Sequence, residues 1–169
     1  MLAAVADLLV ESGYDAVTVD AVAERSGVHR ATVYRRWADV GGLLADVLAA
    51  AATDDWQPPD TGTLRGDLRA VNREVHAALT GGSPITTALI AASFRSPAAA
   101  DALRVFWLDR FERCAPIVTR ALDRGDLAAP VDHRELLVAA TAPVYFEELL
   151  LRHPSDPDRW ADLAADHVR

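Results

Sequence analysis

The stretch from Val19 to Trp37, VDAVAERSGVHRATVYRRW, constrains the fold more than any other part of the chain, because it has the layout of two short helices joined by a glycine turn. In its first half, apolar residues recur at helical spacing on one face. Thr18 precedes this half as an N-cap, and Gly27 follows it as the residue best able to take the left-handed conformation that ends a helix. Val28 can then pack between the two helices, and the second helix is expected to begin near His29.

The second helix has two distinct faces. At about 100° per residue, Val33 and Trp37 lie on one face and are expected to hold this helix against a core. The opposite face presents an arginine, a tyrosine, a threonine and a small alanine, a combination that can enter a DNA major groove without a clash. The residues of this outward face are Ala31, Thr32, Tyr34 and Arg35. Arg30 and Arg36 lie beside it, where long cationic side chains reach phosphates.

The local charge of this stretch favours a nucleic-acid partner. From Arg25 to Trp37 the sequence carries four positive charges and no negative one. The net charge of the whole chain is -8, which by itself argues against a polyanion as partner. DNA responds to the local field, however, and most of the acidic residues lie elsewhere in the chain. The overall charge therefore does not exclude DNA binding.

The run GYDAVTVDAVAERSGVHRATVYRRWAD resembles the helix-turn-helix of the tetracycline-repressor (TetR) family of bacterial transcriptional regulators. The matching positions are Gly13, Tyr14, Thr18, Ala23, Gly27, Val28, Thr32, Tyr34 and Trp37. An ordinary pair of helices with a solvated basic face has no reason to combine all of these residues. The resemblance implies a transcriptional regulator, in most cases a repressor, that a small-molecule effector releases from a double-stranded DNA operator. The residues that it implies in DNA contact are Thr18, His29, Arg30, Ala31, Thr32, Tyr34, Arg35 and Arg36.

The sequence departs from the family pattern at two points. Family members usually carry several basic residues ahead of the first helix, whereas this sequence goes from Met1 straight into apolar periodicity. Members also tend to have a lysine where the helix after the recognition helix begins, and here the sequence reads ADVGG from Ala38 to Gly42. These departures leave an alternative open, namely a helical ligand-binding or scaffold protein that has lost DNA binding.

Helical periodicity and capping signals continue through the rest of the chain. We expect about nine helices, near residues 1–12, 19–26, 29–37, 43–53, 63–80, from 83, 97–124, 132–153 and from 156. No segment alternates like a strand, so the predicted fold is all-α, with an N-terminal three-helix head on a larger helical-bundle body. We assign residues 1–47, which include the start of the linking fourth helix, to the DNA-binding domain and residues 48–169 to the body. The turn-rich loop over 54–62 is the best boundary by composition.

The second half resembles, more loosely, a ligand-binding and dimerisation domain of the same family, in the runs SPAAADALRVFWLDRFERCAPIVTRALDRGDL and APVYFEELL. This resemblance implies a small-molecule pocket and a homodimer through the last two helices, where apolar residues are frequent: Leu149, Leu150, Leu151, Trp160 and Leu163. Candidate pocket residues are Phe94, Phe106, Trp107, Arg110, Cys114, Tyr145 and Phe146, although aromatic residues at helical spacing are more often plain core, and we expect core for most of these. Pro116 and Pro143 lie inside helical patterns and indicate either functional kinks or tolerated bends.

Catalytic residue types are few in the second half, and no spacing joins them into a site. They are His76, Cys114, Glu147 and Glu148. We therefore expect no enzyme, no metal site and no cofactor, with a small helical enzyme that uses Cys114 as a remote alternative. The single cysteine excludes an intrachain disulfide. The chain shows neither a membrane-length apolar run nor a basic n-region at its start, which favours a cytoplasmic protein without membrane contact.

Overall fold

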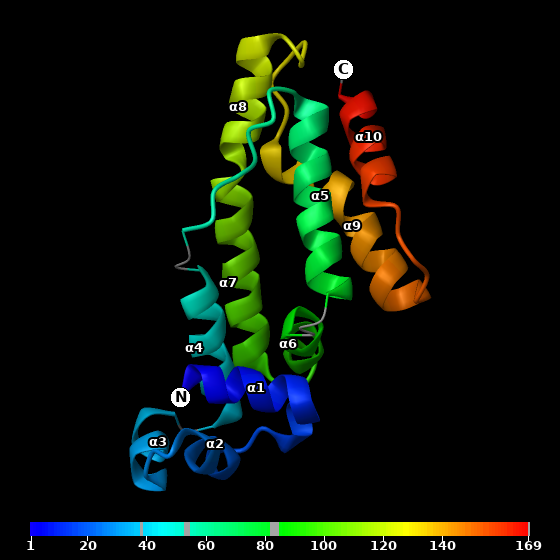
Figure 1. Ribbon diagram of the computed structural model, residues 1–169. Helices are drawn as coiled ribbons and strands as arrows, with labels where there is room; N and C mark the ends of the chain where they lie inside the picture. The colour runs from blue at the N-terminus through cyan, green and yellow to red at the C-terminus, as the bar shows by residue number, and fades with distance from the viewer. Residues whose placement is uncertain (38, 53–54, 82–84, 169) are drawn as a thin grey trace. The chain divides into compact units, whose positions relative to one another are not determined.

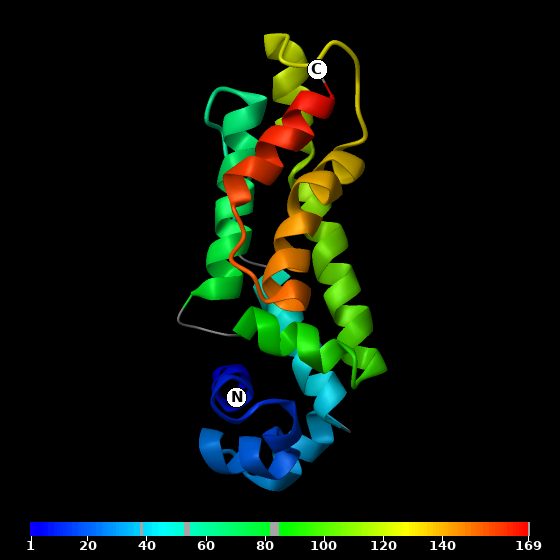
Figure 2. The ribbon, with the colours of Figure 1, turned by 90° about the vertical axis from the view of Figure 1, so that its right-hand side faces the viewer.

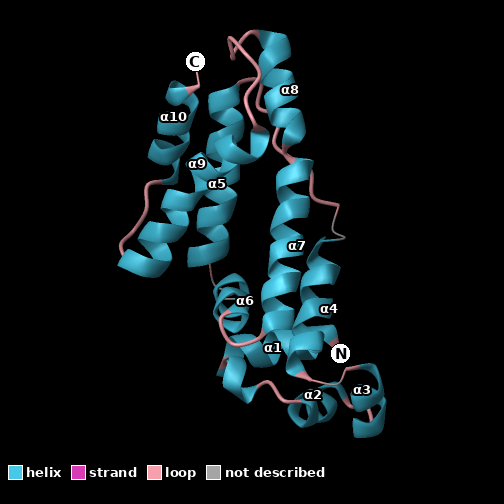
Figure 3. Cartoon of the chain, turned by 180° about the vertical axis from the view of Figure 1, so that it is seen from behind, coloured by secondary structure: helices cyan, strands magenta, loops and turns pink. Residues whose placement is uncertain are grey.

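Helices account for every regular element in the computed structural model, which describes residues 1–37, 39–52, 55–81 and 85–168 (Figure 1). Among these residues there is no strand, so the predicted all-α class is confirmed (Figure 3). None of the helices in these ranges is long and apolar enough to span a bilayer. The chain divides into two compact units, unit 1 with Met1–Asp54 and Ser83–Leu108, and unit 2 with Asp55–Gly82 and Asp109–Arg169.

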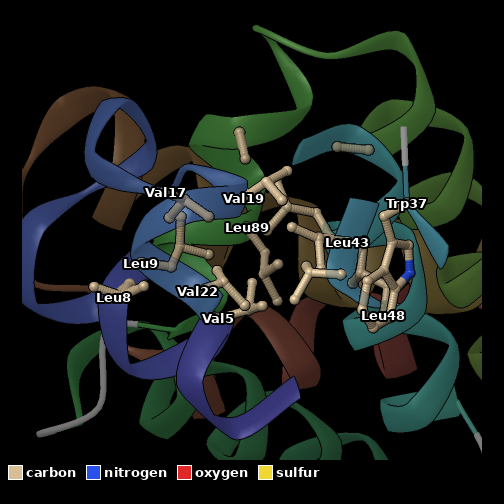
Figure 4. Packing of buried hydrophobic residues seen from close by; sticks show 14 of the residues in the cluster. Val5, Leu8, Leu9, Val17, Val19, Val22, Trp37, Leu43, Leu48 and Leu89 are labelled. Carbon is tan, nitrogen blue, oxygen red and sulfur yellow. The ribbon is translucent and has the colours of Figure 1, made fainter. Parts of the chain in front are cut away.

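Unit 1 is built from short helices around one apolar core. Its elements are α1 (Leu2–Ser12), the 3-10 turn η1 (Tyr14–Ala16), α2 (Val19–Ser26), α3 (Arg30–Arg36), α4 (Val40–Ala52), α6 (Ile85–Ser93) and the first part of α7 (Pro97–Arg113). Side chains from α1, α2 and α4 meet in the core, where Val5, Val22 and Leu43 are fully buried. Figure 4 shows these residues together with Trp37, which follows α3. The apolar residues at helical spacing therefore face a common core, as the sequence pattern predicts.

Unit 2 is a helical bundle with its own core. Its elements are α5 (Leu64–Thr80), the last turn of α7, α8 (Ala115–Arg124), α9 (His133–Tyr145), the π-helical segment η2 (Phe146–Leu151) and α10 (Pro157–His167). Leu68, Ile117 and Ala140 are buried in this core. Helix α10 packs against both α5 and α9, as Figures 1 and 2 show. The buried side chain of Asn72 joins these three helices, because its amide nitrogen donates to the carbonyl oxygens of Ala140 at 2.8 Å and Pro157 at 2.9 Å.

A ladder of ion pairs runs along the contact between α5 and α10. Arginines that lie four residues apart on α5 face aspartates that lie four residues apart on α10, since residues at this spacing share one helix face. The ladder consists of Arg65, Arg69, Arg73, Asp158, Asp162 and Asp166. Its centre is bidentate, with Arg69 Nε and Nη2 donating to the two Asp162 oxygens at 2.7 Å each. Each α5 arginine in the ladder therefore has a carboxylate partner on α10.

The predicted helix over 97–124 is wrong as a single element. Helix α7 ends at Arg113 and α8 begins at Ala115, with Cys114 between them as the N-cap of α8. Pro116 therefore lies in the first turn of α8, where a helix needs no amide donor, and the residue starts a helix instead of kinking one. Helices α7 and α8 thus take the place of the one long helix expected here.

The predicted helix over 132–153 also changes character near its end. Pro143 lies inside α9, as predicted, and the regular helix ends two residues later at Tyr145. The widened turns of η2 follow, and Arg152 then takes a left-handed conformation with φ of 52°. The expected helix start at Ser83-Pro84 and the expected end of the fourth helix near Thr53 lie outside the described residues.

Candidate DNA-binding site

Local hydrogen bonds fix the turn between α2 and α3. The Ala21 amide donates to Thr18 Oγ1 at 3.0 Å, so Thr18 caps α2 as its sequence position predicts. At the other end, Gly27 has φ of 67° and ψ of 15°, which is the left-handed conformation. The Val28 amide donates back to the Ala23 carbonyl at 3.2 Å, the 6→1 bond of a Schellman motif. The chain is thereby redirected within two residues, and α3 can begin at once.

Helix α3 buries one face and exposes the other. His29 is its N-cap, with Nδ1 accepting from the Ala31 amide at 3.3 Å. Val33 is 0% exposed and Trp37 only 4%, which confirms that these two residues hold the helix against the core. On the opposite side, Ala31 and Arg35 are exposed and Tyr34 is 53% exposed, while Thr32 is half-buried. Rigid packing behind α3 thus supports a polar outward face.

The arginines beside this outward face are paired within the protein. Arg30 forms an ion pair with Asp20 of α2, and Arg36 Nη2 donates to Asp46 Oδ2 of α4 at 3.1 Å. Among the described residues, no hydrogen bond or ion pair engages the side chain of Arg35. Exposed pairs of this kind contribute only ~0–1 kcal/mol, so a DNA phosphate can replace the carboxylate as the partner of either arginine.

Arg25 is tied to a different helix. Its guanidinium forms a bidentate pair with Glu11 of α1, with Nη1 and Nη2 donating at 3.0 and 2.7 Å. This hydrogen bonding from Arg25 holds the pKa of the Glu11 carboxyl below its ordinary value. Of the four arginines between Arg25 and Trp37, three therefore lie on α3, on or beside its outward face: Arg30, Arg35 and Arg36.

Asp20 and Asp46 are the members of the site that sequence reasoning missed. Asp46 follows Arg36 by ten residues and lies on another helix, and Asp20 likewise belongs to the helix before Arg30. Neither pair has the three- or four-residue spacing that predicts a contact within one helix. Only the packing of α2 and α4 on α3 reveals these partners.

The seven candidate pocket residues divide between the two units. Phe94, Phe106 and Trp107 belong to unit 1, where Phe94 is 84% exposed. Phe106 packs against the unit 1 core and meets Trp107 edge to face, with ring centroids 5.2 Å apart. The remaining four, Arg110, Cys114, Tyr145 and Phe146, belong to unit 2.

Three of those four share one electrostatic environment in unit 2. Burial raises the pKa of the Cys114 thiol to about 11 and raises the pKa of the Tyr145 hydroxyl well above its ordinary value, and in both cases the charge of Arg110 partly opposes the effect of burial. A thiol with a raised pKa is a poor nucleophile. The Arg110 guanidinium also lies over the Trp56 ring, 4.2 Å from its centroid. Arg110 is therefore the common neighbour of Trp56, Cys114 and Tyr145.

The outer side of α9 and α10 is apolar and hollowed. A groove of about 800 Å³ runs between them, lined by Leu136, Ala139, Pro143, Trp160, Leu163 and His167 among others. A second hollow of about 410 Å³ adjoins it, and Phe146 lines that one. Five large apolar side chains on α9, η2 and α10 are between 41% and 73% exposed: Val138, Phe146, Leu150, Leu151 and Leu163. We call these five residues the α9–α10 apolar face.

Comparison with known proteins agrees with this geometry. A family model described as "Bacterial regulatory proteins, tetR family" matches residues 1–47, and a model described as "Tetracyclin repressor-like, C-terminal domain" matches residues 58–168. An uncharacterised HTH-type transcriptional regulator of Mycobacterium tuberculosis is 33% identical over 99% of this chain and 84% of that protein. The DNA-binding transcriptional repressor TetR of Mycobacteroides abscessus is 31% identical over 92% of this chain and 83% of that protein.

A solved structure shows the same fold. The TetR transcriptional regulator from Agrobacterium tumefaciens superposes with a TM-score of 0.70 at 20% sequence identity, covering 99% of this chain and 89% of that one. The two sequence relatives described above are transcriptional regulators.

Proposed function

The chain belongs to the TetR family of transcriptional regulators, and we propose that it is a homodimeric repressor which a small-molecule effector releases from its DNA operator. The sequence predicted both this family and a DNA-binding transcriptional regulator, and both predictions are confirmed. We assign DNA binding to residues 1–47, and effector binding and dimerisation to residues 48–169. Its site of action would be the bacterial cytoplasm, where the DNA lies.

The observation that carries this proposal is the outward face of α3. Arg35 and Tyr34 project from a helix whose other face is fixed in the core by Val33 and Trp37. A rigid helix that presents an arginine beside a small Ala31 fits the major groove, where arginine can form two hydrogen bonds with a guanine. Thr18, His29, Arg30 and Arg36 lie outside this face, and we propose that they contact the DNA backbone together with Thr32, which lies on the face.

The α9–α10 apolar face supports a dimer. Its side chains would remain in water in a monomer, and a two-fold interface would bury them against the same residues of a second copy. Two copies of α3 can then enter successive major grooves about 34 to 36 Å apart, or a multiple of that.

Effector binding is proposed for unit 2, near Arg110, Cys114 and Tyr145. Apolar burial and one cationic side chain are combined there, as the pKa shifts of Cys114 and Tyr145 indicate. Phe94, Phe106, Trp107 and Phe146 remain candidate pocket residues from the sequence alone, the first three in unit 1 and Phe146 in unit 2. An effector that favours one spacing of the two α3 helices over another would shift the protein away from the operator-binding form.

Selection of DNA fragments from the genome that encodes the protein tests the proposal. The full chain is incubated with random genomic fragments at low and then physiological salt, and bound fragments are sequenced. We expect enrichment of a two-fold symmetric motif, whose neighbouring genes would indicate the effector. Failure to bind any fragment at low salt would contradict DNA binding and favour the ligand-binding or scaffold alternative.

A further inference from the structure

Asp46 holds Arg36 in place from the neighbouring helix α4. A single oxygen, Oδ2, accepts from Trp37 Nε1 at 2.9 Å and from Arg36 Nη2 at 3.1 Å. The Arg36 guanidinium also lies over the Trp37 ring, 4.7 Å from its centroid. Arg36 is therefore held by a charge, by a hydrogen bond and by stacking on a side chain that is itself buried.

Asp20 has the same relation to Arg30 on the other side of the outward face. It lies in the first turn of α2 and forms an ion pair with Arg30, while its second oxygen, Oδ1, is buried without a hydrogen-bond partner among the described residues. One carboxylate from α2 and one from α4 thus neutralise the arginines beside the outward face. The side chain of Arg35, between them, is engaged by no described carboxylate.

We propose that Asp20 and Asp46 are positioning residues that compete with DNA phosphates for Arg30 and Arg36, and so lower the affinity of the protein for all DNA sequences alike. This inference rests on the proposed DNA binding through α3. A phosphate that takes over the Arg36 Nη2 contact displaces Asp46. The carboxylate left behind attracts a cation from solution, which reduces the net release of ions on binding. Phosphates occur at every sequence, so the competition leaves base preference unchanged.

Neutralising Asp46 tests this competition. In Asp46→Asn the amide oxygen can still accept from Trp37 Nε1, but the negative charge opposite Arg36 is gone. We expect tighter binding to specific and random DNA by the same factor. The slope of log K against log salt should steepen by about one unit per half-site, so a dimer loses about tenfold more affinity between 50 and 200 mM salt than the unaltered protein does.

Asp39→Asn is the matched control. Asp39 lies just before α4 and accepts from the Gly42 amide at 2.9 Å, a capping role that asparagine also fills. The substitution removes the same charge close to α3, and no described arginine is paired with Asp39. It should leave the salt slope unchanged, as should Asp46→Glu, which restores the carboxylate. Equal steepening in Asp39→Asn and Asp46→Asn would show a general charge effect and overturn the proposal.

Two further variants separate a positioning role from a merely structural one. Arg36→Gln alone should change the slope by much less than one unit per half-site, because Asp46 already neutralises this arginine. Arg36→Gln combined with Asp46→Asn should return the slope to that of the unaltered protein. If the salt slope of Arg36→Gln alone is shallower by a full unit per half-site, Arg36 binds a phosphate despite Asp46. That result would contradict the inference even if Asp46→Asn does not fold. Absence of DNA binding by the unaltered chain would instead defeat the proposed function, and this inference with it.

Discussion

At Gly27 the backbone conformation alone decides which residue the turn accepts. Its φ of 67° lies in the left-handed region, where a side chain crowds the following carbonyl oxygen. A Cβ added at this position would meet no other atom within 4 Å, so packing does not oppose a larger residue. The family signature at this position therefore reports backbone geometry, which is what places α3 beside α2.

We predict that Gly27→Ala lowers the free energy of unfolding by about 1 kcal/mol, and Gly27→Asn by less, since asparagine tolerates the left-handed region. Gly42→Ala is the control. Gly42 lies inside α4, where an added Cβ would have its nearest neighbour at an ordinary 3.5 Å, from Trp37 Cδ1. Alanine also favours a helix over glycine by roughly 1 kcal/mol, so this variant should be neutral or more stable. Urea denaturation measures both, and equal destabilisation would contradict the argument from backbone geometry.

At the scale of elements, the sequence could predict those helix ends that are fixed by hydrogen bonds between residues at most four positions apart. The Asp132 and Asp156 side chains accept from the amides three residues later, as their positions ahead of a helix indicate. The break at Cys114 could not be predicted, because a proline is compatible both with a kink inside one helix and with the first turn of a new helix. In the structure Pro116 lies in a first turn, and Cys114 and Ile117 are buried in the unit 2 core. The partners of the α3 arginines escaped prediction for the same reason, since they depend on contacts between helices.

The ladder between α5 and α10 makes stability depend on pH through Asp162. Hydrogen bonds from Arg69 and Arg65 lower the pKa of Asp162 from 3.8 to about 2, even though burial opposes the shift. A carboxyl whose pKa is lower in the folded state binds its proton more readily when unfolded. Its contribution to stability is therefore complete above pH 3.8, and it is lost as the pH falls toward about 2.

We predict that Asp162→Asn lowers the free energy of unfolding by about 1 kcal/mol at pH 5, and by progressively less toward pH 3 and below. The modest value reflects the partial exposure of the pair, whose side chains are 38% and 29% exposed. Asp123→Asn, on α8, is the control, because Asp123 forms no ion pair with a described residue. Urea unfolding across this pH range measures the difference in free energy of unfolding between Asp162→Asn and the unaltered protein. A difference that stays constant as the pH falls would contradict the lowered pKa.

At the scale of the whole molecule, the exposed apolar residues are concentrated on one part of unit 2. Of the eight large apolar side chains that are exposed in the described part of the chain, five belong to the α9–α10 apolar face. Glu147 and Glu148, the acidic residues within this stretch, instead accept hydrogen bonds from Ser155 at 2.6 and 2.7 Å. Their carboxylates are thus engaged by the chain after η2, which leaves Phe146, Leu150 and Leu151 to dominate the surface.

We predict that Leu163→Asp converts the proposed dimer to a monomer without unfolding the chain, because Leu163 is 51% exposed in the single chain. A carboxylate buried against a second copy would be strongly unfavourable. Val105→Asp is the control, since Val105 is similarly exposed, at 56%, but lies on α7 in unit 1. Light scattering at micromolar concentration reports the mass. A dimer in Leu163→Asp, or a monomer in the unaltered protein, would contradict this interface.

The central claim is that Arg35 reads a base from the outward face of α3, and the ratio of operator to random-DNA affinity tests it most directly. Fluorescence anisotropy of Arg35→Ala on a fragment selected from the genome should show a loss of about 1 to 3 kcal/mol relative to the unaltered protein, and a much smaller loss on random DNA. Arg104→Ala is the control, because Arg104 is 64% exposed on α7 beside Asp101 and lies outside α2 and α3. It should leave both affinities unchanged. Equal losses on the operator and on random DNA in Arg35→Ala would show that Arg35 contacts only phosphate, and would contradict the claim.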